Sequence, residues 1–169
     1  MKKPIVAIVM GSASDRDTMA EAGKILSEFD IVFEARIMSA HRTPDLVKDY
    51  VSGLSDRKFK VIIAGAGKAA HLPGVAASFT CLPVIGVPME TRDLGGLDSL
   101  LSMVQMPPGI PVGTVGIGKA GARNAGLLAV AILAASDRLL YSKLERYRAV
   151  MANGVSEADE LLQGDDWIK

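Results

Sequence analysis

The chain has 169 residues, 49% of them hydrophobic, and its 19 basic and 19 acidic side chains balance to a formal net charge of zero. This length accommodates one α/β domain with a sizeable core and no second full domain. Because no basic field and no long run of Lys or Arg is present, a nucleic-acid partner is not expected, whereas a small anionic ligand is compatible with the composition.

The ends and the apolar stretches of the chain predict a cytoplasmic protein with no membrane association. Residues 1–4 lead directly into an apolar strand without a signal-peptide pattern. The longest apolar stretch, residues 126–135, is far shorter than the roughly 20 residues that span a bilayer. The single cysteine, Cys81, has an apolar sequence context. That context favours a buried structural thiol over the alternative, a reactive nucleophile.

The first strand–helix unit is predicted over residues 5–29. Residues 5–10 are an apolar run that is too short for a helix, so we expect a buried strand. After a loop at residues 11–15, Ser14 is the expected N-cap of a helix. The inner stripe of this helix recurs at intervals of three and four residues, at Met19, Ala22, Leu26 and Phe29.

The second unit carries the most informative loop of the chain. Residues 31–38 predict another buried strand, and Thr43 and Pro44 are the expected N-cap and first residue of the next helix. His41 and Arg42 therefore lie between a strand end and exposed helix N–H groups, a place that favours an anion. Arg42 suits phosphate, although a surface arginine is the alternative. Histidine is the side-chain type suited to proton transfer near neutral pH, so a general acid/base is one interpretation of His41. The helix has its apolar positions at Leu46, Val47, Tyr50, Val51 and Leu54.

Two more strands are predicted at residues 59–64 and 83–87. Between them we expect a small-residue loop at residues 65–74 and a short helix at residues 75–80. Continuously apolar strands are typical of a parallel sheet that helices cover on both faces, so the chain predicts a doubly wound α/β/α sandwich. Ligands collect at the carboxyl ends of such strands, and we expect the loops after the first three strands to converge on one crevice.

The second half is less regular. Asp98 is the expected cap of a short helix within residues 95–104, and residues 112–115 predict a fifth strand. The helix predicted at residues 121–135 is apolar nearly all round and cannot lie on the surface of so small a monomer, so we expect a homo-oligomer.

A last helix is expected to begin at Ser136 and Asp137, with apolar positions at Leu140, Leu144, Tyr147 and Met151. After Asn153-Gly154 the tail turns acidic and ends near Trp167. Two interpretations of this tail stay open: it packs on a neighbouring subunit, or it is loosely ordered.

Common cofactor and nucleophile motifs are absent. The first loop lacks the G-x-G-x-x-G pattern of a dinucleotide site, and Gly67-Lys68 is followed by Ala69 where a Walker motif has Ser or Thr. Two histidines without a Cys or carboxylate cluster make a poor metal site, and no G-x-S-x-G elbow is present. Of the remaining polar residues, Asp15 suits either a ribose diol or the charge at a helix start, and His71 suits either a structural role or a substrate contact.

Several segments of the chain form one recognisable series. They are Met10-Gly-Ser-Ala-Ser-Asp15, Ser39-Ala-His-Arg-Thr-Pro44, Ala64-Gly-Ala-Gly67, Ala69-Ala-His-Leu-Pro-Gly74, Asp98-Ser-Leu-Leu-Ser102, Val104-Gln-Met-Pro107 and Gly118-Lys-Ala-Gly121. Together they cover the chain from about residue 5 to residue 133. This series resembles the class I PurE family, the N5-carboxyaminoimidazole ribonucleotide mutases of bacterial purine biosynthesis.

The resemblance implies a flavodoxin-like three-layer α/β/α sandwich with a parallel sheet, assembled as an octamer. Residues 1–169 then form a single domain, with a core at about residues 4–135 and a C-terminal helix and oligomer-packing tail at about residues 136–169. It also implies conversion of N5-carboxyaminoimidazole ribonucleotide (N5-CAIR) to 4-carboxy-5-aminoimidazole ribonucleotide (CAIR), with no metal, nucleoside triphosphate or organic cofactor.

The resemblance also implies residue roles. The residue that matches His41 is the general acid/base, and those that match Ser12, Asp15 and Arg42 bind the ribonucleotide. Ser39 and the loop of residues 66–72 complete the pocket, with Ala66, Gly67, Lys68, Ala69, His71 and Leu72 as substrate-binding residues.

Lys68 departs from the family, which usually has Gly at this position. If the position requires a positive φ, a lysine there is strained by about 1 kcal/mol or more. Alternatively, its ammonium points to solvent or to the substrate carboxylate, and the sequence leaves these alternatives open. Two rival functions also stay open: direct carboxylation of aminoimidazole ribonucleotide by the class II variant of the family, and a non-catalytic flavodoxin-like module.

Overall fold

The computed structural model describes residues 3–164 and contains a five-stranded sheet in the order β2-β1-β3-β4-β5. All four strand pairings are parallel. The chain runs from β1 to one edge of the sheet and then returns past β1 to β3, so the strand order reverses between β1 and β3. This is the flavodoxin-like order, and the predicted fold class is confirmed. The strands are β1 (Val6–Met10), β2 (Phe33–Ile37), β3 (Val61–Ala66), β4 (Val84–Pro88) and β5 (Gly113–Thr114).

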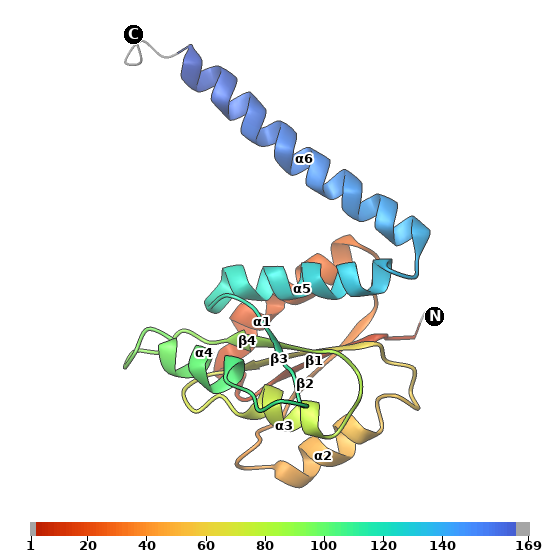
Figure 1. The fold of residues 1–169 in the computed structure, drawn as a ribbon, viewed down its shortest axis with the longest axis vertical. Helices are drawn as coiled ribbons and strands as arrows, with labels where there is room; N and C mark the ends of the chain where they lie inside the picture. The colour runs from red at the N-terminus through yellow and green to blue at the C-terminus, as the bar shows by residue number, and fades with distance from the viewer. Residues whose placement is uncertain (1–2, 165–169) are drawn as a thin grey trace.

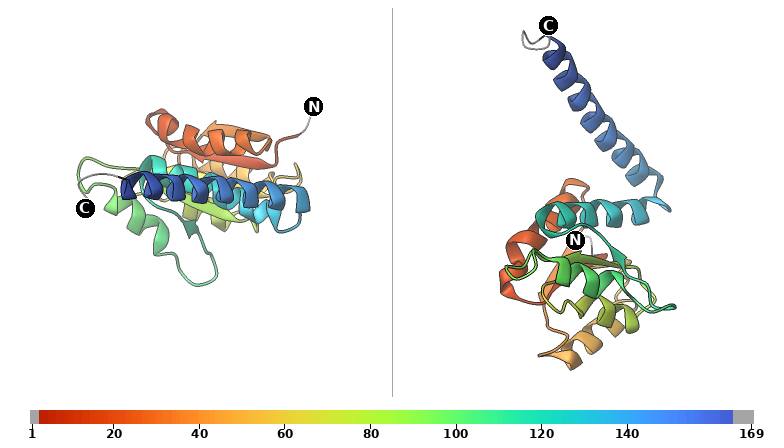
Figure 2. Two further views of the ribbon diagram at one scale, coloured as in Figure 1. Left: turned by 90° about the horizontal axis from the view of Figure 1, so that it is seen from above. Right: turned by 60° about the vertical axis from the view of Figure 1, so that its left-hand side comes forward.

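Helices cover both faces of the sheet (Figures 1 and 2). The helices α1 (Arg16–Glu28) and α5 (Gly118–Ala134) pack on one face. The helices α2 (Pro44–Ser52), α3 (Leu72–Ser78) and α4 (Leu97–Val104) pack on the other. A 3-10 turn, η1 (Ala13–Asp15), precedes α1, and α6 (Arg138–Gln163) follows α5 and projects from the body.

Each face of the sheet has its own core, because successive side chains of a strand point to opposite faces. In β1, Val6, Ile8 and Met10 belong to the cluster under α1 and α5. Ala7 and Val9 belong to the cluster under α2 and α3. The predicted inner stripe of α1 is buried, with Met19, Ala22 and Leu26 at 1% exposure or less.

The strand β2 is not buried, and the prediction for residues 31–38 was wrong in this respect. β2 is the edge strand of the sheet, and Ile37 is 51% exposed. Its charged residues lie in a surface cluster: Glu34 pairs with Arg57, and the guanidiniums of Arg36 and Arg57 lie over the ring of Tyr50. Charged side chains of this kind are typical of an edge strand.

Several local predictions differ from the structure at element ends. The hydroxyl of Ser12, not Ser14, caps the first turn, by accepting from the Ser14 N–H, and Gly96 rather than Asp98 occupies the N-cap of α4. Thr43 is the N-cap residue of α2, but its hydroxyl bonds to the backbone of Ser39 instead of the helix.

The boundaries of three elements and the exposure of Cys81 also differ from the predictions. β3 extends through Ala66, so the loop begins two residues later, and α3 begins at Leu72 rather than at residue 75. α5 begins at Gly118, three residues before the predicted start. Cys81 is exposed, so the prediction of a buried structural thiol was wrong.

The apolar helix α5 is covered within the chain along one side. Ala122, Ala125 and Ala129 are fully buried against α1 and the sheet, while Leu128 is 39% exposed. The contact with α1 is close: a Cβ added at Gly126 would lie 2.8 Å from the Cβ of Ile25 and 3.0 Å from the carbonyl oxygen of Ala22.

Helix α6 is longer than predicted, because it continues through Asn153-Gly154 to Gln163. The side chain of Asp137 caps it by accepting from the N–H groups of Leu139 and Leu140. Its first turns are anchored by buried Leu140 and Leu144. Trp167 and the acidic residues 165 and 166 lie outside the described residues, and within residues 3–164 no helix has the length and apolarity to cross a membrane.

The close approach of α1 and α5 predicts that Gly126→Ala destabilises the fold. The added methyl group meets backbone and a branched Cβ, neither of which moves freely. We expect the free energy of unfolding to fall by about 1 kcal/mol or more, despite the preference of helices for alanine.

Gly53→Ala is the matched control, because Gly53 has right-handed backbone angles and an added Cβ would make only ordinary contacts. It is expected to raise the free energy of unfolding by about 0.4–1 kcal/mol. Chemical denaturation at equal protein concentrations measures both, and equal effects of the two substitutions would contradict this packing.

Candidate active site

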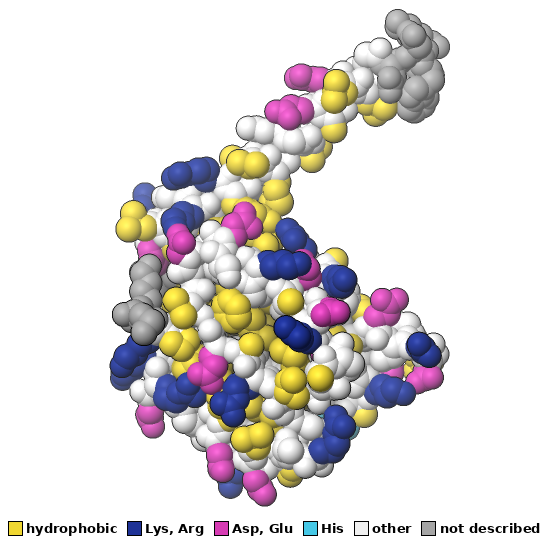
Figure 3. All heavy atoms as spheres, turned by 180° about the vertical axis from the view of Figure 1, so that it is seen from behind, with side chains coloured by type: hydrophobic (Ala, Val, Ile, Leu, Met, Phe, Trp, Pro, Cys, Tyr) yellow, Lys and Arg dark blue, Asp and Glu magenta, His cyan; other side chains and the backbone are white. Residues whose placement is uncertain are grey.

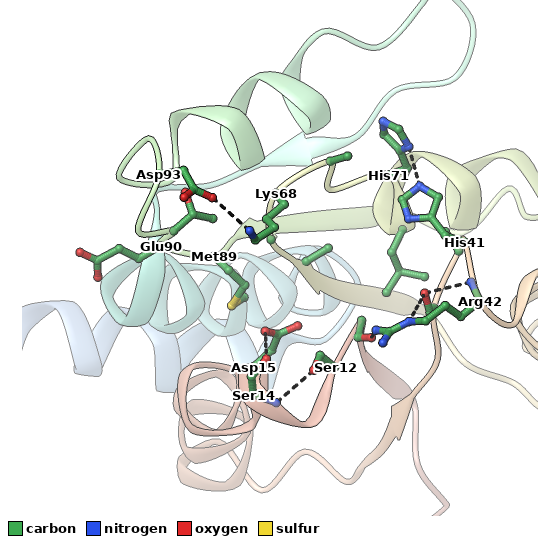
Figure 4. A pocket seen from close by; sticks show the side chains of 18 of the residues that line it. Ser12, Ser14, Asp15, His41, Arg42, Lys68, His71, Met89, Glu90 and Asp93 are labelled. Atoms are coloured by element: carbon green, nitrogen blue, oxygen red, sulfur yellow. Dashed lines mark hydrogen bonds and ion pairs between the residues drawn. The ribbon is translucent and has the colours of Figure 1, made fainter.

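A cavity of about 730 Å³ lies at the carboxyl ends of the central strands. Its walls come from the segments that follow β1, β2, β3 and β4, which are far apart along the chain (Figure 4). All eleven residues predicted for the site line this one cavity: Ser12, Asp15, Ser39, His41, Arg42, Ala66, Gly67, Lys68, Ala69, His71 and Leu72. The three loops that were expected to converge therefore do line one cavity.

The segment after β1 contributes a desolvated carboxylate. Asp15 ends the η1 turn, and its Oδ1 accepts from the hydroxyl of Ser14 at 3.1 Å. Burial raises the pKa of the Asp15 carboxyl above its ordinary value, against hydrogen bonds from Ser14 and the Ser12 backbone that lower it. No cation compensates Asp15 among the ion pairs of the described residues, so its oxygens are available to hydroxyl donors.

The segment after β2 holds Arg42 beside the start of α2. The guanidinium donates from Nη2 to the carbonyl of Gly11 at 3.2 Å and from Nε to the Ser39 hydroxyl at 3.5 Å. The backbone N–H of Arg42 donates to the same hydroxyl at 3.2 Å. These bonds direct Arg42 across the opening between the β1 and β2 segments, where helix N–H groups and a guanidinium together favour an anion.

The two histidines of the chain meet at the cavity wall. The Nε2 of His41 and the Nδ1 of His71 are 2.8 Å apart, and the rings cross at 76°. One ring nitrogen of this pair donates and the other accepts, so the tautomer of each histidine depends on that of its neighbour. Both open interpretations of His71 are compatible with this contact, because it joins the small-residue loop to His41 and also lines the cavity.

Lys68 has a positive φ of 59°, so its backbone has the strained conformation that the sequence left open. Its ammonium is 3.0 Å from Oδ2 of Asp93. Figure 4 shows this pair in the pocket, on the side away from Ser12 and Asp15. The sequence predicted neither the partner nor the loop that carries it.

The segment after β4, residues 89–93, is the wall that the sequence analysis missed. Met89 is buried and packs on the small residues of the floor: a Cβ added at Gly65 would lie 2.9 Å from its Cε, and one at Gly67 would lie 3.2 Å from its Cβ. The rule that located the first three loops applies equally to the carboxyl end of a fourth parallel strand. The signal was therefore present, but the segment lacks a histidine or a glycine run that would draw attention to it.

No cluster of three or more His, Cys, Asp or Glu side chains suited to a metal ion occurs within residues 3–164.

Comparison with known proteins identifies relatives over most of the chain. The family model described as AIR carboxylase matches residues 5–154. An N5-carboxyaminoimidazole ribonucleotide mutase of Vibrio parahaemolyticus is 57% identical over 143 residues, which cover 85% of this chain and 89% of the relative. The protein of the same name from Bacillus subtilis is 53% identical over 160 residues, which cover 95% of this chain and 99% of the relative.

A relative from Mycobacterium leprae, with the same name, is 55% identical over 162 residues, covering 96% of this chain and 94% of the relative. Among solved structures, the PurE of Treponema denticola superposes with a TM-score of 0.86 at 28% identity. That match covers 95% of this chain and 99% of the other.

The desolvated carboxylate predicts a pH-dependent gain in stability for Asp15→Asn. Because burial raises the folded-state pKa of Asp15, its charge lowers the free energy of unfolding at every pH above that value. This destabilisation is lost as the pH falls through the raised pKa toward 3.8, the ordinary value. Asp15→Asn is therefore expected to unfold at higher denaturant concentration than the wild type at pH 8, with a difference that narrows as the pH falls.

Asp17→Asn, at an exposed position two residues further along, is the matched control and is expected to give no such gain. A gain for Asp15→Asn that did not vary with pH, or no gain at all, would show that the carboxylate is not desolvated.

Proposed function

The chain belongs to the AIR carboxylase family, and we propose that it converts N5-CAIR to CAIR in purine biosynthesis, with His41 as the acid/base. Relatives at 53–57% identity, all named as this mutase, support the conversion. The chain is an isomerase that moves a carboxyl group from N5 to C4 of one ribonucleotide. The observation that carries the mechanism is the placement of an anion site, a hydroxyl acceptor and a histidine pair around one cavity.

The ribonucleotide is held by its sugar-phosphate end. Arg42 and the N–H groups at the start of α2 bind the phosphate, with Ser12 beside them. Asp15 accepts from two ribose hydroxyls, which compensates its desolvation. Ser39 keeps Arg42 in place through two hydrogen bonds, and the heterocycle extends toward His41 and the loop of residues 66–72.

The reaction needs one proton delivered and one removed. Protonation of N5 breaks the bond between N5 and the carboxyl carbon, which releases CO2 and leaves a neutral amine. The enamine-like C4 then attacks this CO2 and forms the new carbon–carbon bond. Loss of the C4 proton restores the aromatic ring, so a single histidine that gives the first proton and takes the second leaves no net change.

In this proposal His41 carries both transfers and His71 positions it. The 2.8 Å contact engages Nε2 of His41 with His71 and leaves Nδ1 of His41 for the nucleotide. CO2 must also stay close to C4, and the small residues Ala66, Gly67 and Ala69 let the backbone approach the ring and exclude water.

Two rival functions are less well supported. Direct carboxylation of aminoimidazole ribonucleotide is the class II activity, whereas the relatives over 85% or more of the chain are named as mutases. A phosphate-accepting receiver needs an acidic pair after β1 and an Asp at the end of β3. This chain has Gly65 and Ala66 at the end of β3.

The assembly is a homo-octamer, and the compartment is the cytoplasm. The stripe that anchors α6 through Leu140 and Leu144 continues beyond the body at Met151 and Val155, which are 49% and 72% exposed. Figure 3 shows hydrophobic side chains along this projecting part of α6 and on the body near it. A second copy of the chain that covers both surfaces removes this apolar area from water.

Parallel assays test the activity. One offers N5-CAIR, and the other offers aminoimidazole ribonucleotide with bicarbonate. We expect efficient turnover of N5-CAIR. Efficient turnover in the second assay alone would replace the mutase by the class II activity.

His41→Asn tests the proton transfer. We expect turnover to fall by about 10²–10⁴-fold, because the amide cannot transfer a proton, while CAIR still binds within a fewfold of the wild type. Circular dichroism checks the fold. Retained turnover in a folded His41→Asn variant would remove His41 from this role.

Val155→Asp tests the assembly. Light scattering is expected to give an octamer for the wild type and a smaller species for Val155→Asp, because a charge on the covered stripe disfavours association. Ser156→Asp adds the same charge beside the stripe and is expected to leave the octamer intact. A wild-type monomer, or equal effects of the two variants, would contradict the proposed interface.

A further inference from the structure

Lys68 is a lysine at a position whose backbone favours glycine. Its φ of 59° lies in the left-handed region, which L-residues with a Cβ adopt at a cost. The ion pair with Asp93 does not offset this cost, because the two side chains are 75% and 68% exposed and such pairs contribute little. Stability therefore does not account for a lysine at this position.

The ammonium already holds a carboxylate at the cavity wall. Lys68 comes from the loop after β3 and Asp93 from the loop after β4, and both line the cavity. The hydroxyl of Ser102 donates to the carbonyl of Asp98 at 2.7 Å and lies 3.5 Å from the carbonyl of Lys68. The ammonium of Lys68 therefore contacts an exposed carboxylate that a carboxylate of the ligand can replace.

The cations that line the cavity are Arg42, Lys68 and Arg92. Arg42 is engaged with Gly11 and Ser39 next to the start of α2, the place suited to phosphate. Figure 4 shows Lys68 at a different part of the pocket from Arg42, so one ligand can reach both with its two anionic ends. The ammonium is a compact donor with three N–H groups, which suits a carboxylate that changes its point of attachment.

We propose that Lys68 binds the carboxylate of the ribonucleotide, with Asp93 occupying the ammonium until the nucleotide carboxylate replaces it. Lys68 is then a specificity residue, which distinguishes carboxylated from uncarboxylated aminoimidazole ribonucleotide. The inference rests on the proposed function and extends it, because it assigns a binding group to the part of the substrate that moves.

Calorimetric titration of two nucleotides tests this assignment. CAIR carries the carboxylate, and aminoimidazole ribonucleotide has the same ribose and phosphate without it. We expect Lys68→Gly and Lys68→Gln to weaken CAIR binding by roughly tenfold and to change the binding of aminoimidazole ribonucleotide by less than about twofold. The glycine variant relieves the backbone and the glutamine variant keeps a long uncharged side chain, so a shared loss reports the charge.

Two further variants sharpen the result. Asp93→Asn frees the ammonium and is expected to tighten CAIR binding by about twofold to fivefold, without an effect on aminoimidazole ribonucleotide. Arg92→Gln removes another cation of the cavity and is expected to leave the ratio of the two affinities unchanged.

Equal losses for the two nucleotides, unchanged CAIR binding in both Lys68 variants, or a change of the ratio caused by Arg92→Gln instead would overturn the role of Lys68. Turnover of N5-CAIR by the wild type separates this failure from failure of the proposed function. If the wild type turns over N5-CAIR while the Lys68 variants bind CAIR normally, only this inference falls; if the wild type binds neither nucleotide, both fall.

Discussion

The reversal of strand order between β1 and β3 is the constraint on which the rest of this structure depends. Parallel strands place their carboxyl ends at one edge, and the reversal sends the segments after β1 and β3 to opposite faces of the sheet, which leaves an opening between them. The β2 and β4 segments close the remaining sides. A cavity for a nucleotide thus follows from topology, and the side chains of four segments decide its chemistry.

These side chains depart from what local stability favours. The carboxylate of Asp15 is desolvated and has no ion pair within residues 3–164, and Lys68 has a positive φ of 59°. Departures of this kind persist where a ligand compensates them. Here the residues concerned line one cavity of about 730 Å³.

The sequence predicted what short-range pattern and strand polarity determine. Apolar runs located the first four strands, and the rule for strand carboxyl ends brought Ser12, His41 and His71 to one cavity. Exposure of β2 was missed, because an apolar run does not state which strand lies at an edge, although Glu34 and Arg36 within it were the signal. Helix α6 runs through Gly154 because one glycine costs only about 1 kcal/mol among strong helix formers. The partner of Lys68 depends on a loop 25 residues away, and no local pattern determines such a contact.

A crystal structure with bound CAIR is the most direct test of the account. It predicts the phosphate at Arg42 and the start of α2, the ribose hydroxyls on Asp15, the heterocycle beside His41 and the carboxylate on Lys68 in place of Asp93. A nucleotide bound outside this cavity, or bound in it with its ring away from His41, would contradict the claim that the four segments form one active site.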